Sequence, residues 1–286
     1  MSTASKKITP NKTILKWAGS KVRTIEQLRP HLPRTKRLIE PFAGSMAIFM
    51  NTQYERYVLG DANPDLINMY RFATLNHRDL IDVTRRIFDS AWQLDGKATE
   101  RERYYQIRAR FNKEGIKSLF RAAYFIYLNR HGFRGLCRYN RNGNFNVPYG
   151  EYKKPYFPEA EIRAFAAKVT DDSVNFVCKD WFELLNEIQT NDGIYCDPPF
   201  MGTSDDFSDY WKTGFTNTDH ENLAHTLASR AKVFNCHVTV SNSIIAKELY
   251  ADLGFTIHEI DAPRSISVNG NRKPAREIIA VLKGDK

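Results

Sequence analysis

Cysteine is scarce in this sequence, and its cysteines follow no recognised pattern. They form no Cys-x-x-Cys pair and have no histidines at ligand spacing, which argues against both a zinc site and a disulfide framework. We expect reduced thiols in an intracellular protein, with no bound metal. The four residues are Cys137, Cys178, Cys196 and Cys236.

Long apolar runs are also missing. No segment reaches the length of a membrane span, and residues 2–12 are too polar for the core of a signal peptide. Internal repeats and low-complexity tracts are absent as well. These absences predict a cytoplasmic protein with no membrane partner.

Acidic residues are outnumbered by basic ones. The chain has 33 Asp and Glu against 42 Lys and Arg, which gives a formal net charge of +9. A basic balance favours a polyanionic partner such as nucleic acid. With 286 residues, the chain can bury one large core, with or without a smaller inserted domain.

Short runs of branched apolar residues alternate with segments of helical spacing at both ends of the chain. This alternation is typical of α/β proteins with a mainly parallel sheet flanked by helices. Asn63 before Pro64 is a suitable N-cap for one of the helices. We expect strands at 37–42, 57–60, 174–178, 193–196, 237–241, 256–260 and 277–282, and helices at 46–51, 64–75, 181–188, 219–232 and 244–253.

The middle of the chain has a different pattern. Helical spacing runs without a strand signal through 79–92, 100–112 and 118–130. Residues 132–154 follow, rich in Gly, Asn, Arg and Tyr and without sustained periodicity. A long loop of this kind is usually functional or disordered. We therefore expect a mostly helical insertion with a long loop, set into the α/β domain.

Residues 194–200 read Ile-Tyr-Cys-Asp-Pro-Pro-Phe. Because proline ends a central strand, Asp197 is expected at a strand end, with Cys196 turned to the opposite face and buried. Asp197 and the carbonyl of Pro198 can accept the two hydrogens of an exocyclic amino group on a base, and Phe200 offers a face for stacking. Taken locally, the same residues also fit a strand-ending turn without chemistry.

A turn at 40–45 follows the first expected strand, at the edge where open α/β sheets bind ligands. Gly44 lets the backbone approach a ligand closely, although the chain lacks a Gly-x-Gly-x-x-Gly motif. Asp61 ends the second strand about 20 residues later, the spacing of an acid that binds ribose hydroxyls. Upstream, Trp17 offers an aromatic wall and Lys21 a partner for a carboxylate. Alone, these two also suit a core tryptophan flanked by solvated lysines.

Between residues 130 and 154, six basic side chains stand against one acid, and five aromatic rings lie among them. Basic side chains neutralise phosphates, arginine pairs with guanine, and aromatic rings stack on or between bases. A solvated loop pinned by tyrosines explains the composition equally well, but its position in an insertion favours DNA. A second basic run at 264–276 suits backbone phosphates or a plain hairpin with an Asn-Gly turn.

Together, these segments resemble the Dam-type DNA adenine-N6 methyltransferases, in the order of their α-type members. The resemblance covers residues 14–282. Its segments are Lys-Trp-Ala-Gly-x-Lys from 16, Glu-Pro-Phe-x-Gly-Ser from 40, the acid-ended strand at 57–61, Leu-Asn-Arg-x-Gly-Phe-x-Gly-Leu-Cys-Arg-Tyr-Asn from 128, Asn-Val-Pro-Tyr-Gly from 146, Asp-Pro-Pro-Phe from 197 and Arg-Ser-Ile-Ser from 264.

The resemblance implies a Rossmann-like methyltransferase fold that uses S-adenosylmethionine and releases S-adenosylhomocysteine. It implies methylation of adenine N6 within GATC of double-stranded DNA, by base flipping and direct transfer. We expect a catalytic, cofactor-binding domain at 1–75 and 158–286, with an inserted target-recognition domain at 76–157. We also expect a monomer without an obligate protein partner, in a bacterial cytoplasm or nucleoid or in a phage-infected cell.

Site residues follow from the resemblance, residue by residue. The catalytic residues are Asp197, Pro198, Pro199 and Phe200. The cofactor-binding residues are Trp17, Ala18, Lys21, Phe42, Gly44, Ser45, Asp61 and Asp197. The DNA-binding residues are Lys16 at the first guanine, Phe133 as a wedge, Arg134, Leu136, Arg138, Asn140, and Pro148 at a thymine methyl.

The sequence departs from the family pattern at a few positions. Tyrosine is usual at Phe200 and frequent at Phe133, a glycine is common at Ser20, and a polar amide often stands at Arg134. Two other functions stay open. Cytosine-N4 methyltransferases activate an exocyclic amino group with a similar tetrapeptide, although theirs more often begins with Ser. A non-catalytic DNA-binding protein could also keep the fold. RNA or protein-glutamine methylation fits less well, because the latter group prefers Asn at position 197.

Overall fold

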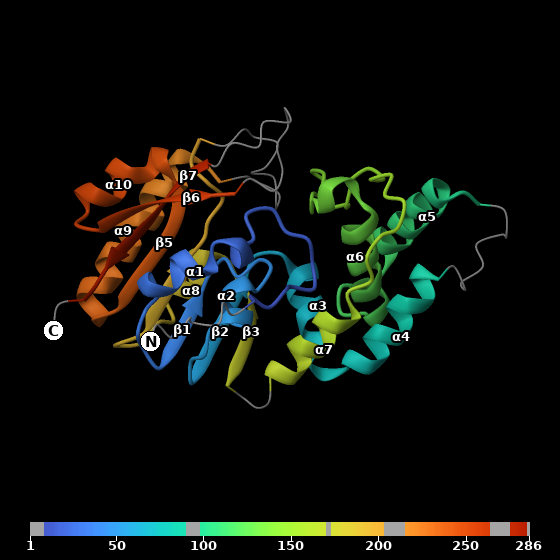
Figure 1. Cartoon of the computed structure of the whole chain (residues 1–286), viewed down its shortest axis with the longest axis horizontal. Helices are drawn as coiled ribbons and strands as arrows, with labels where there is room; N and C mark the ends of the chain where they lie inside the picture. Colours follow the sequence, from blue (N-terminus) through green and yellow to red (C-terminus); the bar gives the residue numbers. More distant parts are fainter. Residues whose placement is uncertain (1–8, 90–97, 170–172, 203–214, 264–274, 285–286) are drawn as a thin grey trace, which may run out of the picture.

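The computed structural model describes residues 9–89, 98–169, 173–202, 215–263 and 275–284. The expected motif at 264–267, most of the basic run at 264–276 and the end of the helix expected at 79–92 lie outside these ranges. Figure 1 shows a sheet with its covering helices on the left and a group of helices on the right.

The sheet has seven strands in the order β3-β2-β1-β4-β5-β7-β6. Neighbouring strands from β3 to β5 are parallel, and β7 is antiparallel to both β5 and β6. The expected mainly parallel sheet is therefore confirmed. The strands are β1 (Arg37–Glu40), β2 (Arg56–Asp61), β3 (Val174–Cys178), β4 (Gly193–Cys196), β5 (His237–Ser243), β6 (Thr256–Ala262) and β7 (Ala275–Leu282).

Alternate residues of the central strands enter two different hydrophobic cores, because successive side chains point to opposite faces of a sheet. On β1, Leu38 belongs to one core and Ile39 to the other. On β4, Tyr195 belongs to the first core and Cys196 to the second. Cys196 is fully buried, as expected.

Helices cover both faces of the sheet. Residues of α1 (Ile25–Leu28), α2 (Ala47–Asn51) and α3 (Pro64–Leu75) join the first core. Residues of α8 (Trp181–Leu185), α9 (Asn217–Phe234) and α10 (Lys247–Asp252) join the second. Short 3-10 turns at 21–23, 29–31 and 244–246 precede or follow these helices.

Helix α3 starts where the sequence predicts. The Oδ1 atom of Asn63 accepts hydrogen bonds from the backbone N–H groups of Asp65 at 3.0 Å and Leu66 at 3.3 Å, with Pro64 at the first helical position. Since β2 ends at Asp61, two residues separate this strand from the helix. The start of α3 therefore fixes the edge of the sheet where Asp61 lies.

The helices on the right of Figure 1 are α4 (His77–Phe88), α5 (Glu100–Lys113) and α6 (Leu119–His131). Residues 122–131 of α6 are all buried, as in a helix surrounded by protein. A further helix, α7 (Glu159–Lys168), was not predicted from the sequence. It contributes Ile162 and Phe165 to the first core, between the sheet and the other helices.

The first core runs without a break from the sheet into the helical part. It contains Leu38 of β1, Tyr70 of α3 and Phe125 of α6. The domain boundaries at 75/76 and 157/158 stay a prediction. Within the described ranges, no helix is both long enough and apolar enough to cross a membrane.

Candidate active site

Three acidic side chains mark one edge of the sheet. Glu40 ends β1, Asp61 ends β2, and Asp197 follows β4. Strand β1 lies between β2 and β4, so the order of strands reverses at this point. Open α/β sheets bind their ligands outside the carboxyl ends of the strands at such a switch point. The expected cofactor-binding and catalytic residues thus come together.

Lys21 forms an ion pair with Asp197, from a 3-10 turn near the start of the chain. Its Nζ atom donates to the two carboxylate oxygens of Asp197 at 2.7 and 2.8 Å, and to the carbonyl of Gly19 at 2.8 Å. Lys21 is only 4% exposed. The sequence predicted a carboxylate partner for this lysine, and the structure identifies one within the protein. A ligand carboxylate at Lys21 must therefore share or replace one of these contacts.

Phe200 lies beside this ion pair. Its ring centroid is 4.8 Å from Nζ of Lys21, and the ring is half-buried. Pro198 is buried, whereas Pro199 and Asp197 are half-buried. The ring of Phe200 and the partly accessible carboxylate of Asp197 thus lie close together. A base could stack on the ring while its amino group donates to the carboxylate.

The backbone after this tetrapeptide is held by the end of β5, a contact not predicted from the sequence. The N–H of Met201 donates to Oδ1 of Asn242 at 3.0 Å, and Oγ of Ser243 donates to the carbonyl of Met201 at 2.7 Å. Asn242 is fully buried. Two polar residues at the end of an apolar strand were the available signal for this support.

Glu40 is an unusual buried carboxyl group next to this site. It is 2% exposed, and its Oε1 atom has no hydrogen-bond partner among the described residues. Burial, together with the negative charge of Asp197, raises the pKa of Glu40 to about 8. Burial also raises the pKa of Asp197 itself, although the nearby Lys21 opposes this effect. At neutral pH, Glu40 is therefore mainly protonated, whereas Asp197 has the ammonium of Lys21 as its partner.

We expect Glu40→Gln to flatten the dependence of stability on pH. A carboxyl group with an unfolded pKa near 4.5 and a folded pKa of about 8 stabilises the protein below the lower value. That stability is lost as pH rises, by about 1.4 kcal/mol per pH unit between the two values. Melting curves at pH 6 and pH 8 should show a smaller drop for Glu40→Gln than for the wild type. Equal drops would contradict this protonation state.

Asp61 is held by two backbone amides. Its Oδ2 atom accepts from the N–H of Gly44 at 3.1 Å, and its Oδ1 atom accepts from the N–H of Asn63 at 2.9 Å. Burial raises the pKa of Asp61 to about 6, against the lowering effect of these two hydrogen bonds. Each carboxylate oxygen can accept a further hydrogen bond, so the fixed group fits a pair of ribose hydroxyls.

Gly44 and Trp17 form a close contact that no larger residue permits. A Cβ atom on Gly44 would lie 2.8 Å from Nε1 of Trp17, and the φ of Gly44 is +47°. Trp17 therefore packs directly on the backbone of this turn. A fixed carboxylate, a glycine turn and an indole ring thus lie together at the edge where open α/β sheets bind ligands.

The other expected cofactor residues belong to the same two segments of chain, the turn after β1 and the segment before Lys21. The Oγ atom of Ser45 donates to Oγ of Ser20 at 3.0 Å, which ties the glycine turn to the segment before Lys21. The ring of Phe42 lies 5.8 Å from that of Phe215, edge to face. Ala18 is half-buried.

The end of β3 continues this edge and was not assigned a role from the sequence. Asp61 of β2 is the register partner of Cys178 of β3, whose side chain is exposed. Asp180 follows and caps α8, accepting from the N–H of Phe182 at 2.8 Å. Phe182 is 52% exposed, a high value for a large aromatic side chain. The available signal was Asp-Trp-Phe two residues after the end of a strand, where an acid can cap the next helix.

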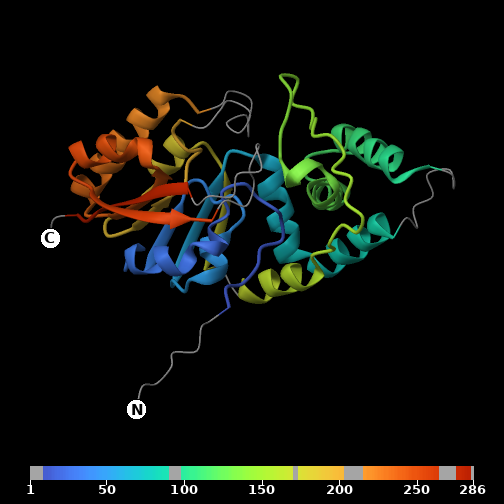
Figure 2. The ribbon, with the colours of Figure 1, turned by 45° about the horizontal axis from the view of Figure 1, so that its top comes forward.

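Residues 136–148 form an irregular two-stranded segment, which we call the reader ribbon; it follows α6 (Figure 2). An antiparallel bridge joins Tyr139 to Phe145. Side chains along it alternate between buried and accessible. The inward residues are Cys137, Tyr139, Phe145 and Val147, and the outward residues include Leu136, Arg138, Asn140, Asn146 and Pro148. Four expected DNA contacts therefore share its outer face.

Hydrogen bonds hold two of these side chains. Nε of Arg138 donates to Oδ1 of Asn146 at 2.9 Å, so Asn146 orients the guanidinium, a role the sequence did not reveal. The Oδ1 atom of Asn140 accepts from the backbone N–H groups of Asn142 and Asn144, both at 3.0 Å. Asn140 therefore stabilises the tip of the ribbon with its oxygen, and any base contact falls to its amide nitrogen.

Lys16 lies next to the ribbon although it is far away in sequence. Asn129 of α6 accepts from the N–H of Lys16 at 2.8 Å and donates to its carbonyl at 2.7 Å and to that of Gly135 at 2.9 Å. The ammonium lies 3.8 Å from the ring centroid of Tyr152. Burial and the charge of Arg130 lower the pKa of Lys16.

Phe133 and Arg134 begin the loop before the ribbon. Phe133 is 42% exposed, and its N–H donates to the carbonyl of Pro148 at 2.8 Å. Arg134 has a φ of +55° and places its guanidinium 4.9 Å from the Phe133 ring. An exposed ring on a fixed backbone suits the expected wedge.

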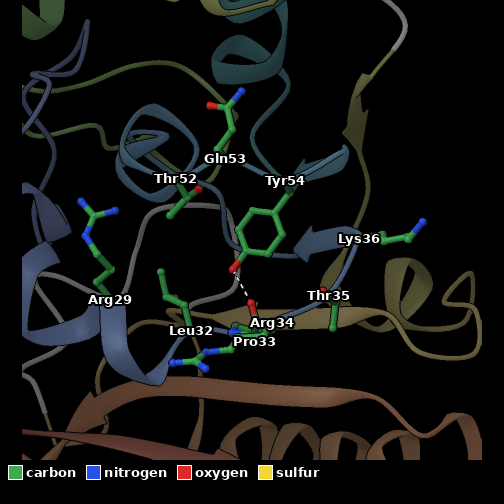
Figure 3. Close-up of a pocket in the computed structure, with 9 residues that line it drawn as sticks. All are labelled: Arg29, Leu32, Pro33, Arg34, Thr35, Lys36, Thr52, Gln53 and Tyr54. Carbon is green, nitrogen blue, oxygen red and sulfur yellow. Dashed lines mark hydrogen bonds between the residues drawn. The ribbon is translucent and has the colours of Figure 1, made fainter.

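One pocket, of about 460 Å³, lies at the other end of β1 and β2 (Figure 3). Tyr54 donates from its hydroxyl to the carbonyl of Pro33 at 2.7 Å beside it. Because its residues precede the strands, the pocket lies away from the carboxyl ends where cofactors bind. It is lined by Arg29, Leu32, Pro33, Arg34, Thr35, Lys36, Thr52, Gln53 and Tyr54. In the described part of the chain, no cluster of His, Cys, Asp and Glu could hold a metal ion.

Comparison with known proteins gives a consistent picture. The chain is 46% identical over 273 residues to the retron Ec67 DNA adenine methylase of Escherichia coli, covering 94% of this chain and 90% of that protein. It is 39% identical over 276 residues to a DNA adenine methylase of Vibrio cholerae, covering 95% and 96%. The DNA adenine methylase of Escherichia coli K12 is 36% identical over 278 residues, covering 96% of both chains.

A family match agrees with these relatives and with the geometry. Residues 17–266 match the D12 class N6 adenine-specific DNA methyltransferase family. This range contains Lys21, Asp61 and Asp197, which meet at one edge of the sheet, and the whole reader ribbon. The chain therefore belongs to the D12 class of N6 adenine-specific DNA methyltransferases.

Proposed function

We propose that this chain transfers a methyl group from S-adenosylmethionine to N6 of adenine within GATC sites of double-stranded DNA. The observation that carries the proposal is the arrangement at one edge of the sheet. Asp197 and Phe200 follow β4, Gly44 follows the neighbouring strand β1, and Asp61, which binds the N–H of Gly44, ends the next strand, β2. Relatives named DNA adenine methylase support the same reaction. The enzyme acts as a monomer in the cytoplasm of a bacterial or phage-infected cell.

The turn after β1 and the end of β2 would hold the cofactor. Asp61 would accept hydrogen bonds from ribose hydroxyls, and Trp17 with Gly44 would cover the backbone of the turn. Phe182, exposed in the first turn of α8 after the neighbouring strand β3, offers a face for the adenine ring. When bound, S-adenosylmethionine would supply a sulfonium-activated methyl group.

Asp197 and the backbone at Pro198 would prepare the target amino group. The amino lone pair of adenine is spread into the ring, which makes the nitrogen a poor nucleophile. If Asp197 and the carbonyl of Pro198 each accept one amino hydrogen, the lone pair points toward the methyl group. The carboxylate also stabilises the positive charge that develops on nitrogen. S-adenosylhomocysteine would be the leaving group, and the extra amino proton would pass to Asp197 or to water. No protein nucleophile is required.

The target base must leave the DNA stack to reach this site. Base flipping costs a few kcal/mol, which contacts in the flipped state must offset. Phe200 offers a stacking face beside Asp197, and the exposed ring of Phe133 could fill the space left in the duplex. The outward side chains of the reader ribbon, with Lys16, would select the sequence.

We expect Asp61→Ala to weaken the binding of S-adenosylmethionine. Loss of hydrogen bonds to a charged acceptor costs roughly 1.5–3 kcal/mol, or about 10- to 150-fold in Kd. The wild-type affinity should also fall as pH decreases through about 6, because protonated Asp61 loses an acceptor site. Calorimetry at pH 8 and pH 5.5 measures both effects, with Asp82→Ala, an exposed position on α4, as control. An unchanged Kd for Asp61→Ala would reduce Asp61 to a structural role.

We expect Arg138→Ala to relax discrimination at one base pair of the site. A bidentate side chain at a base edge contributes about 1–3 kcal/mol of discrimination, whereas a phosphate contact contributes none. Lys16→Ala should act in the same way at the outer guanine. The exposed Lys153 is the matched control. Lys153→Ala should weaken binding about equally on all duplexes, and the slope of the logarithm of the binding constant against the logarithm of salt concentration should fall by about one in magnitude.

The measurement is the rate of label transfer from S-adenosylmethionine to duplexes that carry GATC or each of its single-base variants. The wild type should prefer GATC, and Arg138→Ala should gain relative activity on variants of one base pair. If Arg138→Ala loses activity evenly on every duplex, Arg138 is a backbone contact. Preference of the wild type for an unrelated site would refute the GATC assignment but leave adenine methylation intact.

A further inference from the structure

A buried network outside the chemical site joins the start of α3 to the reader ribbon. Asp65 in the first turn of α3 is 2% exposed, and its Oδ2 atom accepts from the hydroxyl of Tyr139 at 2.7 Å. Arg121 of α6 donates to both oxygens of Asp65. Tyr139 is 6% exposed and lies on the inner face of the ribbon. A buried aspartate is thus shared between a fixed arginine and the ribbon.

Arg121 is itself fixed. Its Nη1 atom donates to the carbonyls of Phe111 and Glu114, both at 2.7 Å, and its guanidinium lies 4.2 Å from the ring centroid of Phe111. This anchors Asp65 to the end of α5. Removal of the Tyr139 hydroxyl therefore leaves Asp65 paired, which makes the contact open to a mild test.

The same short segment of chain carries the cofactor carboxylate. The N–H of Asn63 donates to Asp61, and the side-chain Nδ2 of Asn63 lies 3.4 Å from Sγ of Cys137 on the ribbon. Residues 61–65 thus hold Asp61 at one end and contact the ribbon through Asn63 and Asp65. The ribbon is connected to the sheet edge by two contacts within five residues of chain.

We propose that Tyr139 and Asp65 are positioning residues that set the outer face of the reader ribbon relative to the catalytic edge. The inference rests on the proposed function, in which that face reads bases. Arg138 and Asn140 flank Tyr139 and point outward, so a displaced tyrosine moves both. Displacements of about 1 Å at distant supports can cost about a hundredfold in an enzyme.

Lys16 provides an internal comparison. Its backbone is held by Asn129 of α6 and not by the Asp65 network. A change at Tyr139 should therefore alter discrimination at the base pairs read from the ribbon and spare the outer guanine assigned to Lys16. Global destabilisation would affect all base pairs alike.

The test compares Tyr139→Phe with the wild type and with Tyr156→Phe. Tyr156 is a control outside the network, because its hydroxyl also donates to a carboxylate, Glu161, at 2.9 and 3.0 Å, although its side chain is exposed. We measure kcat/KM on a GATC duplex and on each single-base variant, with the Kd of S-adenosylhomocysteine by calorimetry. If Tyr139→Phe does not fold, Cys137→Ala removes the second contact and takes its place.

In Tyr139→Phe, the preference for the correct base should fall about fivefold or more at the pair read by Arg138. At the outer guanine it should stay within about twofold, as should the Kd of S-adenosylhomocysteine. Unchanged preference, or an equal fall at every base pair, would overturn the positioning role. If the wild type shows no transfer to DNA, the proposed function fails instead. If the wild type prefers another site, the ratios of kcat/KM are measured on that site and its single-base variants.

Discussion

Asp197→Ala should lower the rate of methyl transfer at least about a hundredfold, because loss of one preorganised electrostatic contact in an active site has this effect or a larger one. The variant removes the acceptor that we assign to the amino group of adenine. It also leaves the buried ammonium of Lys21 without its ion-pair partner, so that the carbonyl of Gly19 and the ring of Phe200 remain as its neighbours. For this reason Asp197→Asn, which keeps the shape and one oxygen, should be measured beside it.

Both variants should bind S-adenosylmethionine with nearly wild-type affinity, and Asp252→Asn, an exposed position on α10, serves as control. Single-turnover rates and melting curves separate lost chemistry from lost stability. If the Asp197→Ala variant kept more than about a tenth of wild-type kcat, under ~1.4 kcal/mol of barrier, the role assigned to this carboxylate would be wrong.

Lys21→Met should shift the acid limb of the activity profile to higher pH. Asp197 must be ionised to accept the amino hydrogen. Burial raises its pKa, and the adjacent ammonium of Lys21 opposes this rise. Without that charge the pKa of Asp197 rises further, so the variant needs a higher pH for the same fraction of carboxylate.

The measurement is kcat between pH 5.5 and 9, since kcat reports groups in the enzyme–substrate complex. At pH 7 the variant should be slower than the wild type, and part of this loss should return at pH 9. Lys36→Met is the control, because Lys36 is 78% exposed and lies at the amino end of β1. A profile with an unchanged midpoint would show that Lys21 does not set the charge of Asp197.

The meeting of Asp61, Gly44 and Asp197 could be predicted from the sequence. Each follows an apolar run, and parallel strands bring their carboxyl ends to one edge of the sheet. The partner of Lys21 could not be predicted in the same way. It is 176 residues away, and which carboxylate reaches a lysine depends on how the chain packs.

The reader ribbon was predicted as a loop without periodicity, and its alternation became visible only in the structure. Its inward residues are apolar or aromatic, but Leu136 and Pro148 on the outer face are apolar too, so the pattern of period two is hidden. Helix α7 was missed although Glu159 and Glu161 begin it and Ile162 and Phe165 share one face. Its apolar face is short, and the helix is stabilised by packing against α3 and α4, which the local sequence does not reveal.

The most direct test of the account is nucleoside analysis after reaction. The full chain is incubated with methyl-labelled S-adenosylmethionine and a duplex that contains one GATC site, and the DNA is then digested and separated. We expect the label in N6-methyladenine with the wild type and almost none with Asp197→Ala. Label in N4-methylcytosine, or no transfer by the wild-type enzyme, would contradict the proposed reaction.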